Sequence, residues 1–288
     1  MIICVMKYNL PNCIIIGAQK AATSSLHHYM NTHPDIFMSE HKELNFFCRE
    51  LTWRRGLKWY KKQFPGDFKV FGESSPSYTN FPLYKGVAQR MRSVLPELKL
   101  IYLVRDPINR MISQYLDRVK GCNEHRPIEE AFLEKENNVY LDYSKYFMQI
   151  SEFLPFFSKK EILVLRAEDL SSNPERVLSQ VFCFLGVEDN TSYCDFTRKI
   201  NVSDSKLKIK KPRKIVRYLL SDKTGAKLMK VFIPNSFTER MLQKSFSGEV
   251  IDRPVLSQSV RQELESRLKP DIDSFCSFCG WESKELLP

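Results

Sequence analysis

A lysine and two hydroxyl residues stand close together near the start of the chain, where a strand pattern gives way to a helical one. Residues 13–16 are apolar and mostly β-branched, as in a short buried parallel strand. Apolar residues at helical spacing follow, and Thr23 and Ser24, directly before them, are favourable N-cap residues. The pattern therefore predicts a strand, a tight loop that carries Lys20, and a helix that begins at the two hydroxyl residues.

The predicted loop has the side chains of a phosphate-binding site. A helix start offers unpaired backbone N–H groups and the positive end of a dipole, and both attract phosphate. Ala21 and Ala22 are small enough for the backbone to approach an anion, and Lys20, Thr23 and Ser24 add a positive charge and two hydroxyl donors. In the standard P-loop, lysine directly precedes the Ser or Thr that binds magnesium, whereas Lys20 lies three positions before Thr23. An ordinary strand-to-helix turn with a surface lysine is the alternative interpretation.

A second candidate phosphate site follows residues 98–104, which form the clearest buried strand pattern in the chain. Arg105 stands at the carboxyl end of this strand, where open α/β sheets bind ligands, and its planar guanidinium can hold a phosphate with two hydrogen bonds. Asp106 is expected to cap the next helix, and Ser113 lies about two turns into it, so its hydroxyl can share the face that Arg105 opens. Together with the Lys20 loop, this stretch predicts two phosphate sites on one sheet.

Strand and helix patterns alternate along the rest of the chain. This order predicts an α/β protein with a central parallel sheet flanked by helices. Beyond residue 200 the pattern is interpreted as helical and basic. No internal repeat or long linker is visible, so residues 1–288 are predicted to form one domain. The further strands are expected at residues 35–39, 68–71 and 161–166, and the helices at residues 53–64, 107–120, 127–137, 143–157, 174–185, 257–268 and 272–278.

The net charge of +10 favours an anionic ligand, a nucleic acid or an acidic surface as partner. Seven of the thirteen residues at 205–217 are basic, which predicts either a rim that attracts polyanions or a solvated face. The hydrophobic content of 43% is that of a soluble globular protein, and no apolar run approaches the roughly 18 residues of a membrane span. Residues 1–10 are too short for a signal peptide, so a cytoplasmic protein is expected.

Four segments of the chain resemble the motifs of sulfotransferases that use 3′-phosphoadenosine 5′-phosphosulfate (PAPS), and they follow one another along the chain as those motifs do. Residues 14–26 resemble the loop that binds the 5′-phosphosulfate, and residues 103–115 resemble the motif that binds the 3′-phosphate. Residues 42–47 and 72–78 are similar to the two intervening motifs of the heparan-sulfate-type branch and its bacterial relatives. Residues 268–273 and 280–281 near the end of the chain are also similar, so the resemblance covers most of the chain.

The resemblance implies a P-loop-like three-layer fold and transfer of the sulfuryl group by in-line displacement. The acceptor would be a hydroxyl or amine of a small-molecule metabolite, glycolipid or glycan. The donor would leave as adenosine 3′,5′-bisphosphate, and no metal is implied. Lys20 would bridge the 5′-phosphate and the leaving oxygen, while residues 21–24 would hold the phosphosulfate through backbone N–H groups and two hydroxyls. Arg105 and Ser113 would hold the 3′-phosphate.

The resemblance also implies a general base and marks two departures from the family pattern. Glu43 has the position of the catalytic glutamate, and His41 is its rival because histidine is the base in the cytosolic branch. Alanines stand where the usual loop has glycines. Many relatives carry a second catalytic lysine where this chain has Ser74, and a lysine from residues 206–211 is one candidate replacement.

Two other function classes are weighed against a sulfotransferase. A nucleotide or small-molecule kinase of related topology needs Gly-Lys-Ser/Thr and an acidic magnesium ligand after a strand, and neither is found. A nucleic-acid-binding protein would use residues 205–217, but this run lacks the interleaved aromatic residues on which bases stack. Small-molecule or carbohydrate acceptors are therefore the expected partners, without nucleic acid and without a membrane span, and the oligomeric state stays open.

Overall fold

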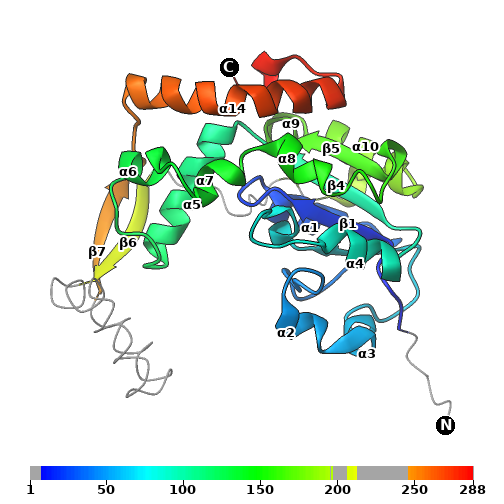
Figure 1. Ribbon diagram of the computed structural model, residues 1–288. Coiled ribbons are helices and arrows are strands. Elements are labelled where there is room, and N and C mark those ends of the chain that lie inside the picture. The colour runs from blue at the N-terminus through cyan, green and yellow to red at the C-terminus, as the bar shows by residue number, and fades with distance from the viewer. Residues whose placement is uncertain (1–7, 195, 197–205, 213–245, 288) are drawn as a thin grey trace, which may run out of the picture.

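A five-stranded parallel sheet forms the centre of the computed structural model (Figure 1). The structure describes residues 8–194, 196, 206–212 and 246–287. The strand order is β2-β3-β1-β4-β5, which confirms the predicted α/β class with a parallel sheet. The strands are β1 (Cys13–Gly17), β2 (Ile36–Met38), β3 (Val70–Ser74), β4 (Lys99–Val104) and β5 (Ile162–Arg166).

Helices flank this sheet on its faces, and they bury the residues of its central strands. Every residue of β1 and β3 is buried, as expected for a parallel sheet packed on both faces. The longest helix among the described residues, α14 (Gln258–Cys279), contacts α5 (Pro107–Lys120) and α8 (Tyr146–Ser151) (Figure 1). The other α-helices of the described residues are α1 (Thr23–Met30), α2 (Glu50–Trp53), α3 (Gly56–Lys61), α4 (Val87–Val94), α6 (Ile128–Leu133), α7 (Val139–Asp142), α9 (Ala167–Ser172) and α10 (Pro174–Leu185). Short 3₁₀ helices are η1 (Pro76–Thr79), η2 (Lys159–Glu161), η3 (Thr191–Tyr193) and η4 (Ser283–Glu285).

The helix after β4 confirms the sequence prediction at both of its ends. A side-chain oxygen of Asp106 accepts a hydrogen bond from the backbone N–H of Asn109 at 2.7 Å, and Pro107 is the first helical residue. The helix ends at Lys120, as predicted. Its amphipathic side packs on the core, so the Arg105 stretch has a rigid support.

The start of α1 differs from the prediction. The helix begins at Thr23, and its N-cap is Ala22, which has a left-handed φ of 59° and makes no capping hydrogen bond through its side chain. Thr23 and Ser24 are therefore the first two helical residues rather than caps. Their hydroxyls instead contact a lysine from another segment, as described below.

Two strands also replace part of the predicted helical C-terminal region. β6 (Lys206–Pro212) and β7 (Phe246–Asp252) form an antiparallel pair beside α5 (Figure 1). The helical interpretation is wrong here because Leu207 and Ile209 alternate with lysines at the two-residue period of a strand. Farther on, α14 confirms a C-terminal helix, although as one helix that runs through Pro270 instead of two.

The helical prediction for residues 53–64 is also only partly correct. Gly56 has a φ of +75° and separates α2 from α3, because this left-handed conformation interrupts a right-handed helix.

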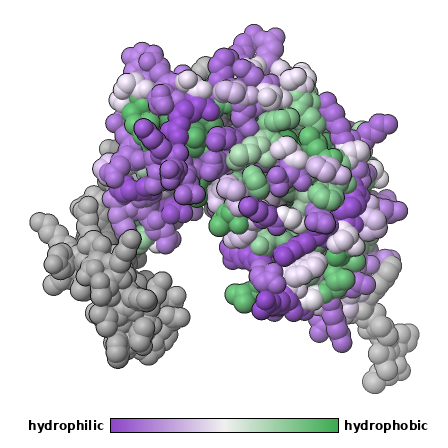
Figure 2. Space-filling model, viewed as in Figure 1, coloured by the Kyte–Doolittle hydropathy of each residue, from purple (hydrophilic) through white to green (hydrophobic). Residues whose placement is uncertain are grey.

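Within the described ranges, no helix is both long and apolar enough to cross a membrane. The face seen in Figure 2 is mostly hydrophilic, with hydrophobic side chains in separate groups. The assignment of residues 1–288 to one domain stays a prediction.

Candidate active site

The predicted site segments meet at one edge of the sheet. Because all five strands run parallel, the segments that follow them emerge at the same edge. The Lys20 loop follows β1 and Arg105 follows β4, and these two strands are neighbours. Nη1 of Arg105 donates a hydrogen bond to the backbone carbonyl of Lys20 at 3.2 Å. The two predicted phosphate stretches are therefore in direct contact.

The Lys20 loop has an unusual backbone and an open helix start behind it. Lys20 and Ala22 both have left-handed φ values, of 70° and 59°. The loop turns sharply into α1, whose first N–H groups have no partner within the helix. Nζ of Lys20 donates to a carboxylate oxygen of Asp117, on α5, at 3.1 Å. In this arrangement an anion at the helix start would lie beside the lysine and the two hydroxyl residues that begin α1.

Arg105 lies just before α5 and Ser113 lies on it, as the sequence indicated. Both are half-buried. Nε of Arg105 is buried and has no hydrogen-bond partner among the described residues. A buried donor of this kind is costly unless a ligand or water satisfies it, so the unpaired N–H suits an anion. The roles of Arg105 and Ser113 as ligands of a 3′-phosphate stay predictions.

The two candidate bases follow β2 and are both exposed. The backbone N–H of Glu43 donates to the carbonyl of Ser74 at 2.9 Å, which holds this segment against the end of β3. The carboxylate of Glu43 lies 4.0 Å from Nζ of Lys42. The carbonyl of His41 accepts a hydrogen bond from the hydroxyl of Ser39 at 3.0 Å. The choice of Glu43 over His41 as base stays a prediction.

Lys42 is a site residue to which the sequence analysis gave no role. Its Nζ donates to Oγ of Ser24 at 2.6 Å and lies 3.3 Å from Oγ1 of Thr23. Burial lowers the pKa of Lys42, Lys20 lowers it further, and Glu43 raises it. The available signal was the position of Lys42 directly before the candidate base, within residues 42–47. Only the packing of this segment against α1 shows which way the lysine reaches.

A comparison with protein families shows to which family the chain belongs. Residues 10–245 match the family described as "Sulfotransferase domain". The chain belongs to the sulfotransferase family. This assignment confirms the predicted family and selects one of the three function classes considered.

Individual relatives agree with the family assignment. The chain is 27% identical to the membrane-associated sulfotransferase kil1 of Dictyostelium discoideum, covering 65% of this chain and 58% of that protein. It is 29% identical to heparan sulfate glucosamine 3-O-sulfotransferase 6 of Homo sapiens, covering 62% of this chain and 53% of that protein. The chain thus matches little more than half the length of these relatives. The fold is similar to a sulfotransferase structure from Alicyclobacillus acidocaldarius, with a TM-score of 0.66, 21% identity, and coverage of 95% of this chain and 97% of that one.

A buried arginine contacts the Lys20 loop through a backbone carbonyl. Arg110 is fully buried on α5, and its guanidinium donates to Oγ of Ser144 at 2.6 Å and to the carbonyl of Tyr140 at 2.7 Å. It also donates to the carbonyl of Gln19, next to Lys20, at 3.4 Å. Burial lowers the pKa of Arg110 to about 10. The sequence analysis missed this role, although Arg110 lies inside the segment that resembles the 3′-phosphate motif.

A buried glutamate ties the segment at residues 42–47 to the sheet. Oε1 of Glu73 accepts hydrogen bonds from the hydroxyls of Tyr60 at 2.6 Å and Tyr78 at 2.8 Å. Oε2 accepts from Oγ of Ser75 at 2.7 Å, and Oγ of Ser75 in turn accepts from the backbone N–H of Asn45 at 3.0 Å. Burial raises the pKa of Glu73, and the three hydroxyl donors oppose this effect. The network thus fixes the backbone two residues after the candidate base.

The raised pKa of Glu73 predicts a pH-dependent stability. The folded state holds the proton of this carboxyl more tightly than the unfolded state, whose pKa is near the ordinary 4.5. The stabilising contribution is therefore complete below pH 4.5 and is lost as pH rises through the folded-state value. We expect the free energy of unfolding of the wild type, minus that of Glu73→Gln, to fall with rising pH in urea denaturation. A difference that rises with pH would show that the three hydroxyls outweigh burial.

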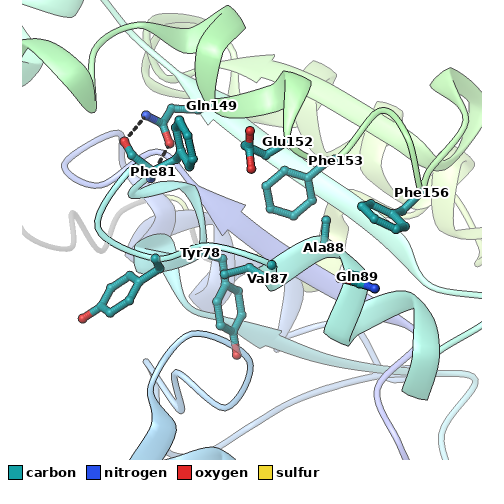
Figure 3. A pocket seen from close by; sticks show the side chains of 11 residues that line it. Tyr78, Phe81, Val87, Ala88, Gln89, Gln149, Glu152, Phe153 and Phe156 are labelled. Carbon is teal, nitrogen blue, oxygen red and sulfur yellow. Dashed lines mark hydrogen bonds between the residues drawn. The ribbon is translucent and has the colours of Figure 1, made fainter.

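Two pockets lie outside the Lys20 loop and the Arg105 stretch. One, of about 230 Å³, lies between η1, α4 and α8, where the side-chain amide of Gln149 both donates to and accepts from the backbone of Phe81 at 2.8 Å (Figure 3). The other, of about 550 Å³, lies beside α1 and β2. Neither pocket is lined by Lys20, Lys42 or Arg105. Within the part of the chain that the structure describes, no group of three His, Cys, Asp or Glu side chains is placed to hold a metal ion.

Proposed function

We propose that this sulfotransferase domain transfers a sulfuryl group from PAPS to a hydroxyl or amine of a small-molecule metabolite, glycolipid or glycan. The observation that carries the proposal is the hydrogen bond of 3.2 Å between Arg105 and the Lys20 loop. PAPS has one phosphate at each end of its ribose, so it needs two anion sites at a short, fixed separation. The contact joins two such candidates at one edge of the sheet.

The residues at this edge fit the donor. The N–H groups at the start of α1, with Lys20, Thr23 and Ser24, would hold the 5′-phosphosulfate. This group of PAPS carries the activated sulfuryl group. Arg105, whose buried Nε has no partner among the described residues, would hold the 3′-phosphate with Ser113. Ala22 adopts a left-handed φ, and its side chain is a single methyl group, so it leaves room for an anion to approach the backbone of the loop.

Glu43 and Lys20 would act on opposite sides of the transferring group. Glu43 accepts the proton of the acceptor as the acceptor's oxygen or nitrogen bonds to sulfur. The bond between sulfur and the 5′-phosphate oxygen breaks, and its electron pair leaves with adenosine 3′,5′-bisphosphate. Lys20 and the helix start stabilise the negative charge that develops on this oxygen.

The acceptor would approach through a hollow in the surface. Figure 2 shows the surface hollowed between the side that carries α5 and α6 and the side that carries α2 and α3. Along the chain, Arg105 lies two residues before α5 and Glu43 lies seven residues before α2, so the two candidate residues come from the segments that lead into helices on either side of this hollow. The name of one relative, which refers to heparan sulfate, supports a glycan among the proposed acceptors.

A binding experiment with Arg105→Ala tests the proposal. The wild type should bind adenosine 3′,5′-bisphosphate more tightly than adenosine 5′-phosphate in calorimetry, because only the former presents a 3′-phosphate. Losing a charged hydrogen-bonding partner should weaken the bisphosphate by about 10- to 100-fold in Arg105→Ala and leave the monophosphate nearly unchanged. Ser113→Ala should show the same selectivity with a smaller loss.

The matched control is Arg176→Ala, which removes an exposed arginine on α10. It should bind both nucleotides as the wild type does. Equal losses of both nucleotides in Arg105→Ala would contradict the 3′-phosphate assignment. Tighter binding of ATP with magnesium than of the bisphosphate would contradict PAPS as the donor.

A further inference from the structure

We propose that Lys42 is a catalytic residue whose ammonium group contacts the transferring sulfuryl group and takes the place of the lysine that is absent at Ser74. The inference rests on the proposed use of PAPS. It assigns the second positive charge of the site to the segment that also carries the candidate base.

The position of Lys42 between two parts of the site is the first argument. Its Nζ lies 2.6 Å from Oγ of Ser24, at the start of α1, and 4.0 Å from the carboxylate of Glu43. The hydroxyl marks the end of the site that holds the phosphosulfate, and the carboxylate marks the end that receives the acceptor's proton. In an in-line displacement the sulfur lies between acceptor and leaving oxygen. A cation that borders both ends therefore lies beside the path of the sulfuryl group.

The surroundings of Ser74 are the second argument. The side chain of Ser74 is fully buried, and its Oγ has no hydrogen-bond partner among the described residues. It carries no charge, so it cannot act as a lysine would. The carbonyl of Ser74 accepts the backbone N–H of Glu43 at 2.9 Å, so the segment that bears Lys42 lies directly against this position. The positive charge of Lys42 thus lies on the segment that is hydrogen-bonded to Ser74.

The electrostatics of Lys42 are the third argument. Only 25% of its side chain is exposed, and burial lowers the pKa of Lys42, while Glu43 raises it and Lys20 lowers it further. Two lysines that repel each other across a partly desolvated site are stabilised by an anion between them. The hydroxyls of Thr23 and Ser24 take two of the three ammonium donors of Lys42 and leave one for such an anion. A sulfuryl oxygen is the anion that the proposed donor presents there.

The test compares binding of PAPS with binding of adenosine 3′,5′-bisphosphate, which lacks the sulfuryl group. Calorimetry on the whole chain, without acceptor, should show that Lys42→Met weakens PAPS by about 10- to 100-fold and the bisphosphate by much less. Lys20→Met should weaken both, because Lys20 is assigned to the 5′-phosphate. Lys42→Gln, which keeps a donor for the two hydroxyls, should show the same selective loss, and Lys42→Arg should restore part of the PAPS affinity.

The matched control is Lys69→Met, which removes an exposed lysine paired with Asp35 at 2.7 Å, away from the site edge. It should leave both affinities unchanged, and thermal melting of each variant verifies that it is folded. Equal loss of both ligands in the Lys42 variants would overturn the inference, since Lys42 would then bind the 5′-phosphate. Unchanged PAPS affinity would overturn it as well. If the wild type binds neither ligand, the proposed donor itself is wrong, and the assignment of Lys42 falls with it.

Discussion

Glu43→Gln is expected to bind PAPS as the wild type does and to lose turnover by roughly 10²- to 10⁴-fold. A base that accepts a proton only in the transition state contributes little to donor affinity. The amide is nearly isosteric with the carboxylate, but it cannot take the proton. Calorimetry with PAPS, and sulfate transfer from labelled PAPS to an acceptor found by mass-spectrometric screening, measure the two quantities separately.

His41→Asn is the matched control for the candidate base. If His41 only borders the site, this variant should be much more active than Glu43→Gln. An active Glu43→Gln together with an inactive His41→Asn would move the base to His41 and the chain closer to the cytosolic branch.

Lys20→Ala is expected to lower turnover by about 10²-fold or more, because its charge would stabilise both the 5′-phosphate and the leaving oxygen. The same variant should bind adenosine 3′,5′-bisphosphate more weakly, since the product retains the 5′-phosphate. Single-turnover transfer from labelled PAPS, at donor concentrations that saturate each variant, separates the chemical step from binding. Near wild-type turnover would contradict the phosphate-loop assignment.

Asp117→Asn controls for the ion pair that Lys20 makes in this structure. Nζ of Lys20 lies 3.1 Å from Asp117, whose side chain is 56% exposed. An exposed pair of this kind contributes about 0.2 to 1 kcal/mol, so its loss cannot account for a 10²-fold effect. Asp117→Asn should keep the wild-type rate and bind the donor equally well or slightly better, because Lys20 no longer has to exchange one partner for another.

The sequence by itself determined the elements whose signals lie within a few neighbouring residues. Asp106 and Pro107 specify the start of α5 through a cap and a fixed φ, and Gly186 ends α10 because it adopts a left-handed φ of 76°. The apolar runs of β1 and β4 predicted buried parallel strands for the same local reason. Parallel strands in turn place their following loops at one edge, so the contact between Arg105 and the Lys20 loop was foreseeable in outline.

The tertiary structure alone decided which side chains meet at that edge. The bond from Lys42 to Ser24 spans 18 positions of sequence, and that from Lys20 to Asp117 spans 97. The hydroxyl of Tyr60 likewise reaches Glu73 from 13 positions away, whereas those of Ser75 and Tyr78 come from the residues that directly follow it. Spacing along the chain does not encode such partners, because they depend on strand order, on the packing of α1 and α5 over the sheet, and on the rotamers that this packing leaves open.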